Sequence, residues 1–246
     1  MLESFSIIDP QLVAAIAVGV VAGLMRGFAG FGSGMLMAPI FALLFGPVQT
    51  VAVIILMEIA VTVQLLPGVK KHVQWSFVGL MGGVATLFMP FGSWLLVTVD
   101  SQVMTRIIAV IVLGFVFVLW MGWRYHGPKK ATITAGIGAI SGTMMAATSL
   151  GNPPVMLYML AGQDSAAISR ANVTAYFAIT LVALFVIMLT AGLVTMQSLA
   201  IATVLLLPYM LAAWLGSRLF SAADEQLYRN VALVFLLAAG IIGLVA

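Results

Sequence analysis

The stretch Arg26-Gly27-Phe28-Ala29-Gly30-Phe31-Gly32-Ser33-Gly34, followed by Pro39, decides the fold of this chain. It places one permanent positive charge and four glycines inside a long apolar region. An arginine in hydrocarbon is costly unless it faces a partner, a cavity or a ligand, and clustered glycines weaken a helix and free its backbone N–H groups. The stretch therefore predicts a broken helix with a cationic centre, an arrangement that can hold an anion inside a membrane.

The composition predicts an all-α, multi-pass membrane protein. Of the 246 residues, 63% are hydrophobic and 7% are charged, whereas soluble domains carry about 25% charged residues. Almost the whole chain is then embedded in the bilayer, which leaves no room for a soluble catalytic domain. The net charge of +3 is spread over short loops, so it gives no sign of nucleic-acid binding.

Catalytic, cofactor and metal chemistry have no visible basis in the sequence. The chain has no cysteine, which excludes disulfides and thiol catalysis. Its two histidines, His72 and His126, lie singly in basic loops, and a metal site needs clustered ligands. The apolar segments carry no nucleophile–base set and no phosphate-binding loop. We therefore expect no cofactor, no metal and no enzyme activity.

Eight apolar segments are long enough to cross a membrane, which takes about 20 residues. They lie near 11–31, 48–68, 75–97, 103–123, 131–149, 167–194, 198–219 and 227–246. Two further apolar segments, 35–46 and 153–162, are too short, and each follows a break rich in small residues. We expect half-helices or re-entrant pieces there, which in transporters point to the substrate site.

The two halves of the sequence resemble each other. The glycine stretch and Pro39 of the first half correspond in the second half to Gly138-Ala139-Ile140-Ser141-Gly142 and Gly151-Asn152-Pro153-Pro154. Polar residues recur as well: Gly92-Ser93 precedes Asp100, Gln102 and Arg106 as Gly216-Ser217 precedes Asp224, Gln226 and Arg229. We predict two pseudo-symmetric transmembrane repeats, 1–124 and 131–246, joined by a cytoplasmic loop at 124–130.

Lysine and arginine indicate the orientation, because they favour the cytoplasmic side. Two basic loops, one with Lys70 and Lys71 and one with Arg124, Lys129 and Lys130, are separated by two long helices, so both can be cytoplasmic. If each half has five segments, the halves are inverted; if the short segments do not cross, the halves are parallel. The charge distribution favours inversion. The five tryptophans lie near segment ends, as interfacial anchors do.

The first candidate site surrounds Arg26. Its planar guanidinium matches two oxygens of a carboxylate, sulfonate or sulfite. The backbone of the glycine break can line the same cavity, at Gly30, Gly32, Ser33 and Gly34. Arg26 can instead form a structural ion pair with Glu58, or extend to the membrane interface. Glu58 lies deep within segment 48–68, where a carboxylate either pairs with a cation, here Arg26 or Arg170, or serves proton coupling.

The second candidate site is the break Thr148-Ser149-Leu150-Gly151-Asn152-Pro153-Pro154. Proline donates no hydrogen bond and disfavours helix in the residue before it, so backbone groups near Gly151 and the Asn152 amide can line a cavity. Segment 153–162 begins here, with the positive end of its dipole at the break. Arg170 is a further candidate, as a second anion contact, as a gate at the cytoplasmic mouth, or as an interfacial anchor.

At these residues the chain resembles the sulfite exporter TauE/SafE family of bacterial membrane proteins. The resemblance is carried by Arg26 to Gly34 with Pro39, by Gly142 through Pro154 with Tyr158, and by Arg170-Ala171 and Tyr176-Phe177. The second motif departs from the family's glycine-richer pattern at Ala146, Ala147 and Thr148. The resemblance implies transport of small anions, such as sulfite, sulfonates or related organosulfur compounds, across the bacterial inner membrane.

We therefore expect an exporter of small anions that works by alternating access, with its site near the membrane midplane where the two breaks meet. Its partners are the anion and the lipid bilayer, and a homo-oligomer is compatible with the sequence. A passive anion channel or facilitator is the main alternative, because the same glycines and arginine can line a pore. A structural membrane subunit is a further alternative, against which the buried charges of Arg26 and Glu58 argue.

Overall fold

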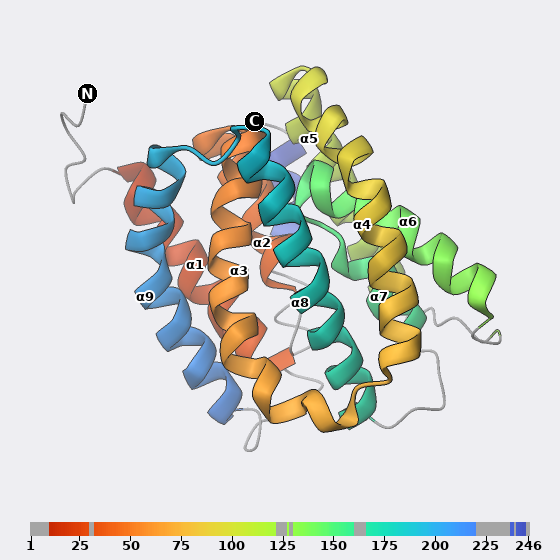
Figure 1. Cartoon of the computed structure of the whole chain (residues 1–246). Coiled ribbons are helices and arrows are strands. Elements are labelled where there is room, and N and C mark those ends of the chain that lie inside the picture. Colours follow the sequence, from red (N-terminus) through yellow and green to blue (C-terminus); the bar gives the residue numbers. More distant parts are fainter. Residues whose placement is uncertain are drawn as a thin grey trace.

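The structure is a computed structural model that describes residues 10–29, 32–121, 127, 130–159, 166–219, 237–238 and 240–244. Over these residues the chain is helical and contains no strand, as predicted (Figure 1). The elements are α1 Pro10–Ala29, α2 Ser33–Phe45, α3 Pro47–Val69, the short 3-10 helix η1 Lys70–His72, α4 Trp75–Thr98, α5 Ser101–Trp120, α6 Ala131–Thr148, α7 Asn152–Met159, α8 Ala166–Thr190 and α9 Met196–Leu219.

Six helices of the described part are long and apolar enough to cross a membrane. Their spans are Pro10–Gly27, Pro47–Gly68, Trp75–Thr98, Ser101–Val118, Ala171–Thr190 and Met196–Arg218. They coincide with six of the eight predicted segments. The predicted segment 131–149 forms α6, whose 18 residues include many glycines, serines and threonines; it is not among the six. Most of segment 227–246 lies outside the described residues, so eight spans remain a prediction.

The first predicted break separates α1 from α2. α1 ends at Ala29, and α2 has only 13 residues and begins at Ser33. Gly32 between them has a φ of 94°, a left-handed conformation that favours glycine. α2 ends before Gly46, and Pro47 opens α3, where proline's missing N–H breaks no helical bond. The short helix predicted near 35–46 is therefore present.

The second predicted break separates α6 from α7. α6 ends at Thr148, and Ser149 follows with a φ of 62°. α7 has eight residues and begins at Asn152. Pro153 and Pro154 occupy its first turn, a position that proline tolerates because those N–H groups have no partner within the helix. The short helix predicted near 153–162 is present over Asn152–Met159, and 160–162 lie outside the described part.

Two helix pairs pack so closely that glycine is required in them: α1 with α9, and α4 with α6 (Figure 1). A Cβ atom at Gly27 of α1 would overlap the carbonyl oxygen of Ala213 in α9, and one at Gly142 of α6 would overlap that of Ala85 in α4. Such small-residue contacts let membrane helices approach backbone to backbone. Each pair joins one helix of the first sequence half to one of the second.

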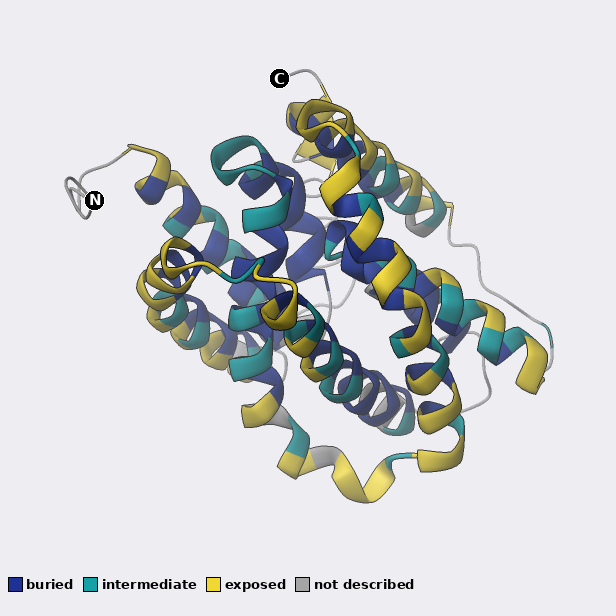
Figure 2. Cartoon of the chain, turned by 45° about the horizontal axis from the view of Figure 1, so that its top comes forward, coloured by how far each residue is buried: buried dark blue, intermediate teal, exposed yellow. Residues whose placement is uncertain are grey.

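Between these pairs, α3 and α8 pack against each other along a seam and run in opposite directions (Figure 1). Hydrogen bonds attach α8 to its neighbours: Asn172 exchanges two with Gln74 before α4, at 2.8 and 2.9 Å, and Tyr176 shares one of 2.7 Å with Ser141 of α6. We group α4, α6, α7 and α8 as the second unit, although α8 also packs extensively against α3. The first unit contains α1, α2, α3 and α9, with α5 against α2. The buried faces of the helices turn inward (Figure 2).

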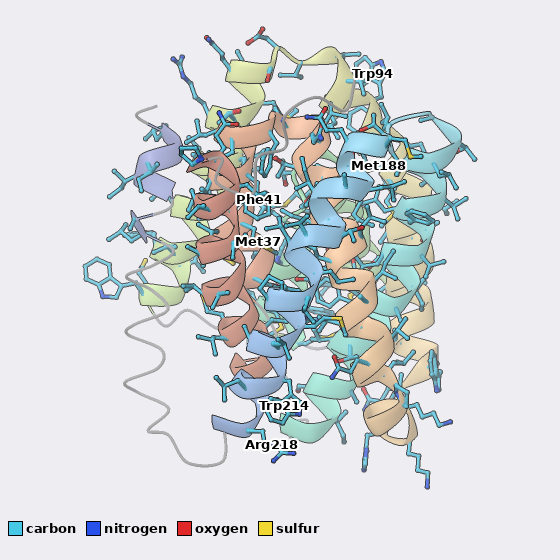
Figure 3. All side chains as sticks on the ribbon, turned by 90° about the vertical axis from the view of Figure 1, so that its left-hand side faces the viewer. Met37, Phe41, Trp94, Met188, Trp214 and Arg218 are labelled. Atoms are coloured by element: carbon cyan, nitrogen blue, oxygen red, sulfur yellow. The ribbon has the colours of Figure 1, made fainter. Side chains whose placement is uncertain are left out.

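The ends of the bundle carry aromatic and basic side chains. Trp94 and Trp214 lie toward opposite ends (Figure 3) and are 55% and 48% exposed, as interfacial anchors are. The guanidinium carbon of Arg218 lies 4.6 Å from the centre of the Trp214 ring. α9 ends at the same end of the bundle as η1 with its two lysines (Figure 1), the end that the basic loops assign to the cytoplasm.

Several predicted features fall outside the described residues. They include Gly30 and Phe31 in the first break, and Trp123, Arg124, His126 and Lys129 in the loop between the halves. The second copy of the matched polar residues, Asp224, Gln226 and Arg229, also lies outside them. In the first copy, the Asp100 carboxylate accepts a hydrogen bond of 2.9 Å from the N–H of Gln102, which caps the start of α5.

Candidate functional site

Arg26 is buried at the end of α1 and pairs with Glu58 of α3. The Nε atom of Arg26 lies 3.1 Å from Oε2 of Glu58. The two residues are 1% and 4% exposed. A buried charge of either sign is costly in hydrocarbon unless it is paired. The ion pair predicted as one alternative for Arg26 is therefore present.

The second carboxylate oxygen of Glu58 joins the ion pair to two other helices. The Ser33 hydroxyl at the start of α2 donates a hydrogen bond to Oε1. The Tyr209 hydroxyl of α9 donates to the same oxygen at 2.6 Å. Glu58 thereby links α1, α2, α3 and α9. These contacts satisfy a carboxylate far from water and fix the start of α2 next to the end of α1.

Arg26 also contacts the second unit. Its guanidinium carbon lies 5.0 Å from the centre of the Phe177 ring on α8. A cation over an aromatic face at this distance is attracted by the ring's quadrupole. The end of α1 therefore lies at the seam between the two units and contacts α8 there.

A small cavity of about 10 Å³ lies in this seam, room for about one water molecule. Both units supply its walls in equal measure. Gly34, Ile54, Ile55 and Glu58 line it from the first unit, and Met145, Ser149, Phe177 and Leu181 line it from the second. An anion of several heavy atoms does not fit into this volume.

The two breaks meet at this cavity. A Cβ atom at Gly34 would lie 3.1 Å from the carbonyl oxygen of Ser149. The second break is held by neutral groups: the Ser141 hydroxyl donates to the carbonyl oxygen of Gly151 and shares a hydrogen bond with Tyr176. The first break is thus built around a charged pair, and the second around a serine and a tyrosine.

The predicted site residues differ in where they lie. The structure brings together Arg26, Glu58, Ser33 and Gly34, and places Gly32 at the start of α2. Gly151 is buried against Met145 and Ser141 of α6. Asn152 opens α7 and Arg170 lies in α8, but their side chains, and Gly30, are outside the described part.

Two residues of the site were not predicted from the sequence. Tyr209 lies within an apolar helix and is fully buried, and a buried tyrosine usually hydrogen-bonds through its hydroxyl. That rule could have singled out Tyr209, although it could not have named Glu58 as its acceptor. Phe177 appeared only within the family motif, and one aromatic ring among many in an apolar chain carries no signal of its own.

The comparison with protein families identifies the family to which this chain belongs. The sequence matches the family described as Sulfite exporter TauE/SafE over residues 15–242. The chain belongs to the TauE/SafE family. The comparisons with curated proteins and with solved structures gave no match. Family membership and the six apolar helices make this TauE/SafE protein a multi-pass membrane transporter of the sulfite-exporter type.

Proposed function

We propose that this protein exports a small organosulfur or sulfur oxyanion, such as a sulfonate or sulfite, across the bacterial inner membrane. One observation carries the proposal: a buried arginine lies in the seam where two interrupted helices meet, next to a cavity with walls from both units. Glu58 lies near the middle of α3, which supports a site at mid-depth in the membrane, where transporters bind their substrates.

Arg26 and the start of α2 form the anion site in this proposal. The guanidinium offers a planar set of donors that fits two oxygens of one anion. The N–H groups at the start of α2, near Ser33 and Gly34, add the positive end of a helix dipole. Glycine at 34 keeps the backbone accessible, since it lines the cavity itself. Asn152 and Arg170 complete the site from the second half.

Transport proceeds by relative movement of the two units at the α3–α8 seam. Glycine contacts lock α1 to α9 and α4 to α6, so these pairs move as bodies. The chain crosses between the units at the η1 turn, between α4 and α5, between α5 and α6, and between α8 and α9, where Gly192 has a φ of 69°. In the predicted repeats α1 corresponds to α6 and α9 corresponds to α4, so the pair α1–α9 corresponds to the pair α6–α4. This relation, and the opposite directions of α3 and α8, support inverted repeats.

The membrane potential favours export. An outward-positive potential of 100 mV makes the outward transfer of one negative charge favourable by about 2.3 kcal/mol. In the closed seam Glu58 provides the counter-charge of Arg26, and return of the empty protein restores this contact.

Uptake of labelled sulfite and sulfonates into proteoliposomes tests the proposal. Because Arg26→Gln alone leaves Glu58 buried without its cation, the informative variant is Arg26→Gln/Glu58→Gln. We expect saturable uptake with counterflow in the native protein and at least about a tenfold loss in the double variant. Arg106→Gln, at an exposed arginine of α5, is the matched control and should transport normally.

Two results would contradict the proposal. A double variant that elutes as a folded protein and transports at the native rate removes the role of Arg26. Flux without counterflow or saturation, with large single-channel currents, indicates the passive channel instead.

A further inference from the structure

Ser149 adopts a backbone conformation that suits glycine better than serine. Its φ is 62°, and it is the one non-glycine residue of the described part with a positive φ. Left-handed backbone crowds the Cβ atom of any residue other than glycine. Such residues persist where the surrounding structure over-determines them, often at ligand sites. A serine at this position therefore calls for a reason in its side chain.

The Ser149 hydroxyl is buried and has no hydrogen-bond partner among the described residues. Ser149 is one of the residues that line the seam cavity, together with Glu58 and Gly34 of the first unit. An unsatisfied hydroxyl inside a protein is costly. The hydroxyls of Thr62 and Ser93 are also buried without a partner among the described residues, but of these three residues only Ser149 lines the cavity. By contrast, the hydroxyls of Ser33 and Ser141 in the same region are engaged, by Glu58 and by the carbonyl of Gly151 respectively.

We propose that Ser149 is a substrate-binding residue, whose hydroxyl donates a hydrogen bond to the anion held by Arg26. This inference rests on the proposed transport function and assigns one contact within that site. The left-handed backbone at the end of α6 holds Ser149 in the cavity wall, so strain at this residue pre-organises the donor.

The proposal gives a reason why the site selects an oxyanion over a halide. Arg26 belongs to the first unit and Ser149 to the second, so an anion that contacts both needs acceptor oxygens pointing in two directions. Sulfite and sulfonate groups each carry three oxygens around one sulfur. Such an anion bridges the units and draws the seam closed around itself. A halide of one atom cannot offer a planar pair of acceptors to the guanidinium and a separate one to the hydroxyl.

Two substitutions distinguish the effect of the Ser149 hydroxyl from the effect of its backbone conformation. Ser149→Gly removes the hydroxyl and relaxes the left-handed conformation, whereas Ser149→Ala removes the hydroxyl and keeps the strain. If the hydroxyl binds the anion, both variants raise the KM for sulfite by about tenfold or more, with a smaller change in kcat. Ser217→Ala, at a serine whose hydroxyl bonds the carbonyl of Trp214 in its own helix, should keep the native KM.

Sulfite-induced thermal stabilisation of the purified protein provides a second measurement, which should weaken in both Ser149 variants. A native KM and native stabilisation in Ser149→Gly would overturn the inference, because the residue would then serve only the backbone. A native protein that transports neither sulfite nor sulfonate removes the proposed function itself, and with it this assignment. The first result leaves transport intact, so the two failures are distinguishable.

Discussion

Neutralising both members of the Arg26–Glu58 pair together should destabilise the protein much less than the sum of the two single neutralisations. Arg26→Gln leaves a carboxylate that is 4% exposed without its cation, and Glu58→Gln leaves a guanidinium that is 1% exposed without its anion. Removal of one partner from a buried pair costs about 3–5 kcal/mol. The double variant buries no net charge, so its cost should fall at least about 2 kcal/mol below the sum of the two single costs.

The assay is a double-mutant cycle on the free energy of unfolding in mixed detergent micelles, followed by circular dichroism and tryptophan fluorescence. Arg106→Gln, which removes an exposed charge from α5, should shift the unfolding free energy by no more than about 0.5 kcal/mol. If the sum of the two single losses of unfolding free energy equals the loss in the double variant within about 0.5 kcal/mol, Arg26 and Glu58 do not interact, because independent sites add in this way.

Three further perturbations test the packing and the unit boundaries. Gly27→Ala places a methyl group onto the α9 backbone and should lower the unfolding free energy by about 1–3 kcal/mol. Gly114→Ala is the control, because a Cβ atom at Gly114 would have no neighbour within 4 Å, and it should leave the unfolding free energy unchanged. Equal effects of the two substitutions would contradict the close α1–α9 contact. The chain has no cysteine, so Gly82→Cys/Ile179→Cys can form one disulfide between α4 and α8, whose Cβ atoms would lie 3.4 Å apart, near the usual range. The disulfide joins the two sequence halves but lies within one unit, so its formation should preserve transport. If transport stops when the disulfide forms, the sequence halves move against each other instead. Tyr209→Phe removes a hydrogen bond to Glu58 and should cost about 1.5–3 kcal/mol, and an unchanged melting temperature would contradict that contact.

The breaks in the helices could be predicted because their causes are local. Glycine at 32 and the two prolines after Asn152 act through their own backbone geometry, so the short helices α2 and α7 appeared where the sequence placed them. The two charges in apolar segments likewise predicted an ion pair between Arg26 and Glu58 as one alternative. Both kinds of inference need only neighbouring residues or the high cost of a charge in hydrocarbon.

The assembly of the site was beyond the sequence because its contacts are long-range. Tyr209 donates to Glu58 across 151 residues of chain. The predicted internal duplication indicates which helices would correspond but not which pack together. Since lipid is as apolar as the helix faces, hydrophobicity does not select neighbours in a membrane. The α1–α9 and α4–α6 pairs, which decide the two units, depend on backbone contacts at particular glycines.

The most direct test of the anion site is a crystal structure with selenite, the selenium analogue of sulfite, located by the anomalous scattering of selenium. We predict one selenium peak in the α3–α8 seam, with selenite oxygens in contact with the Arg26 guanidinium and the Ser149 hydroxyl. Selenium bound only elsewhere, with the Arg26–Glu58 pair and the small cavity unchanged at saturating selenite, would contradict it.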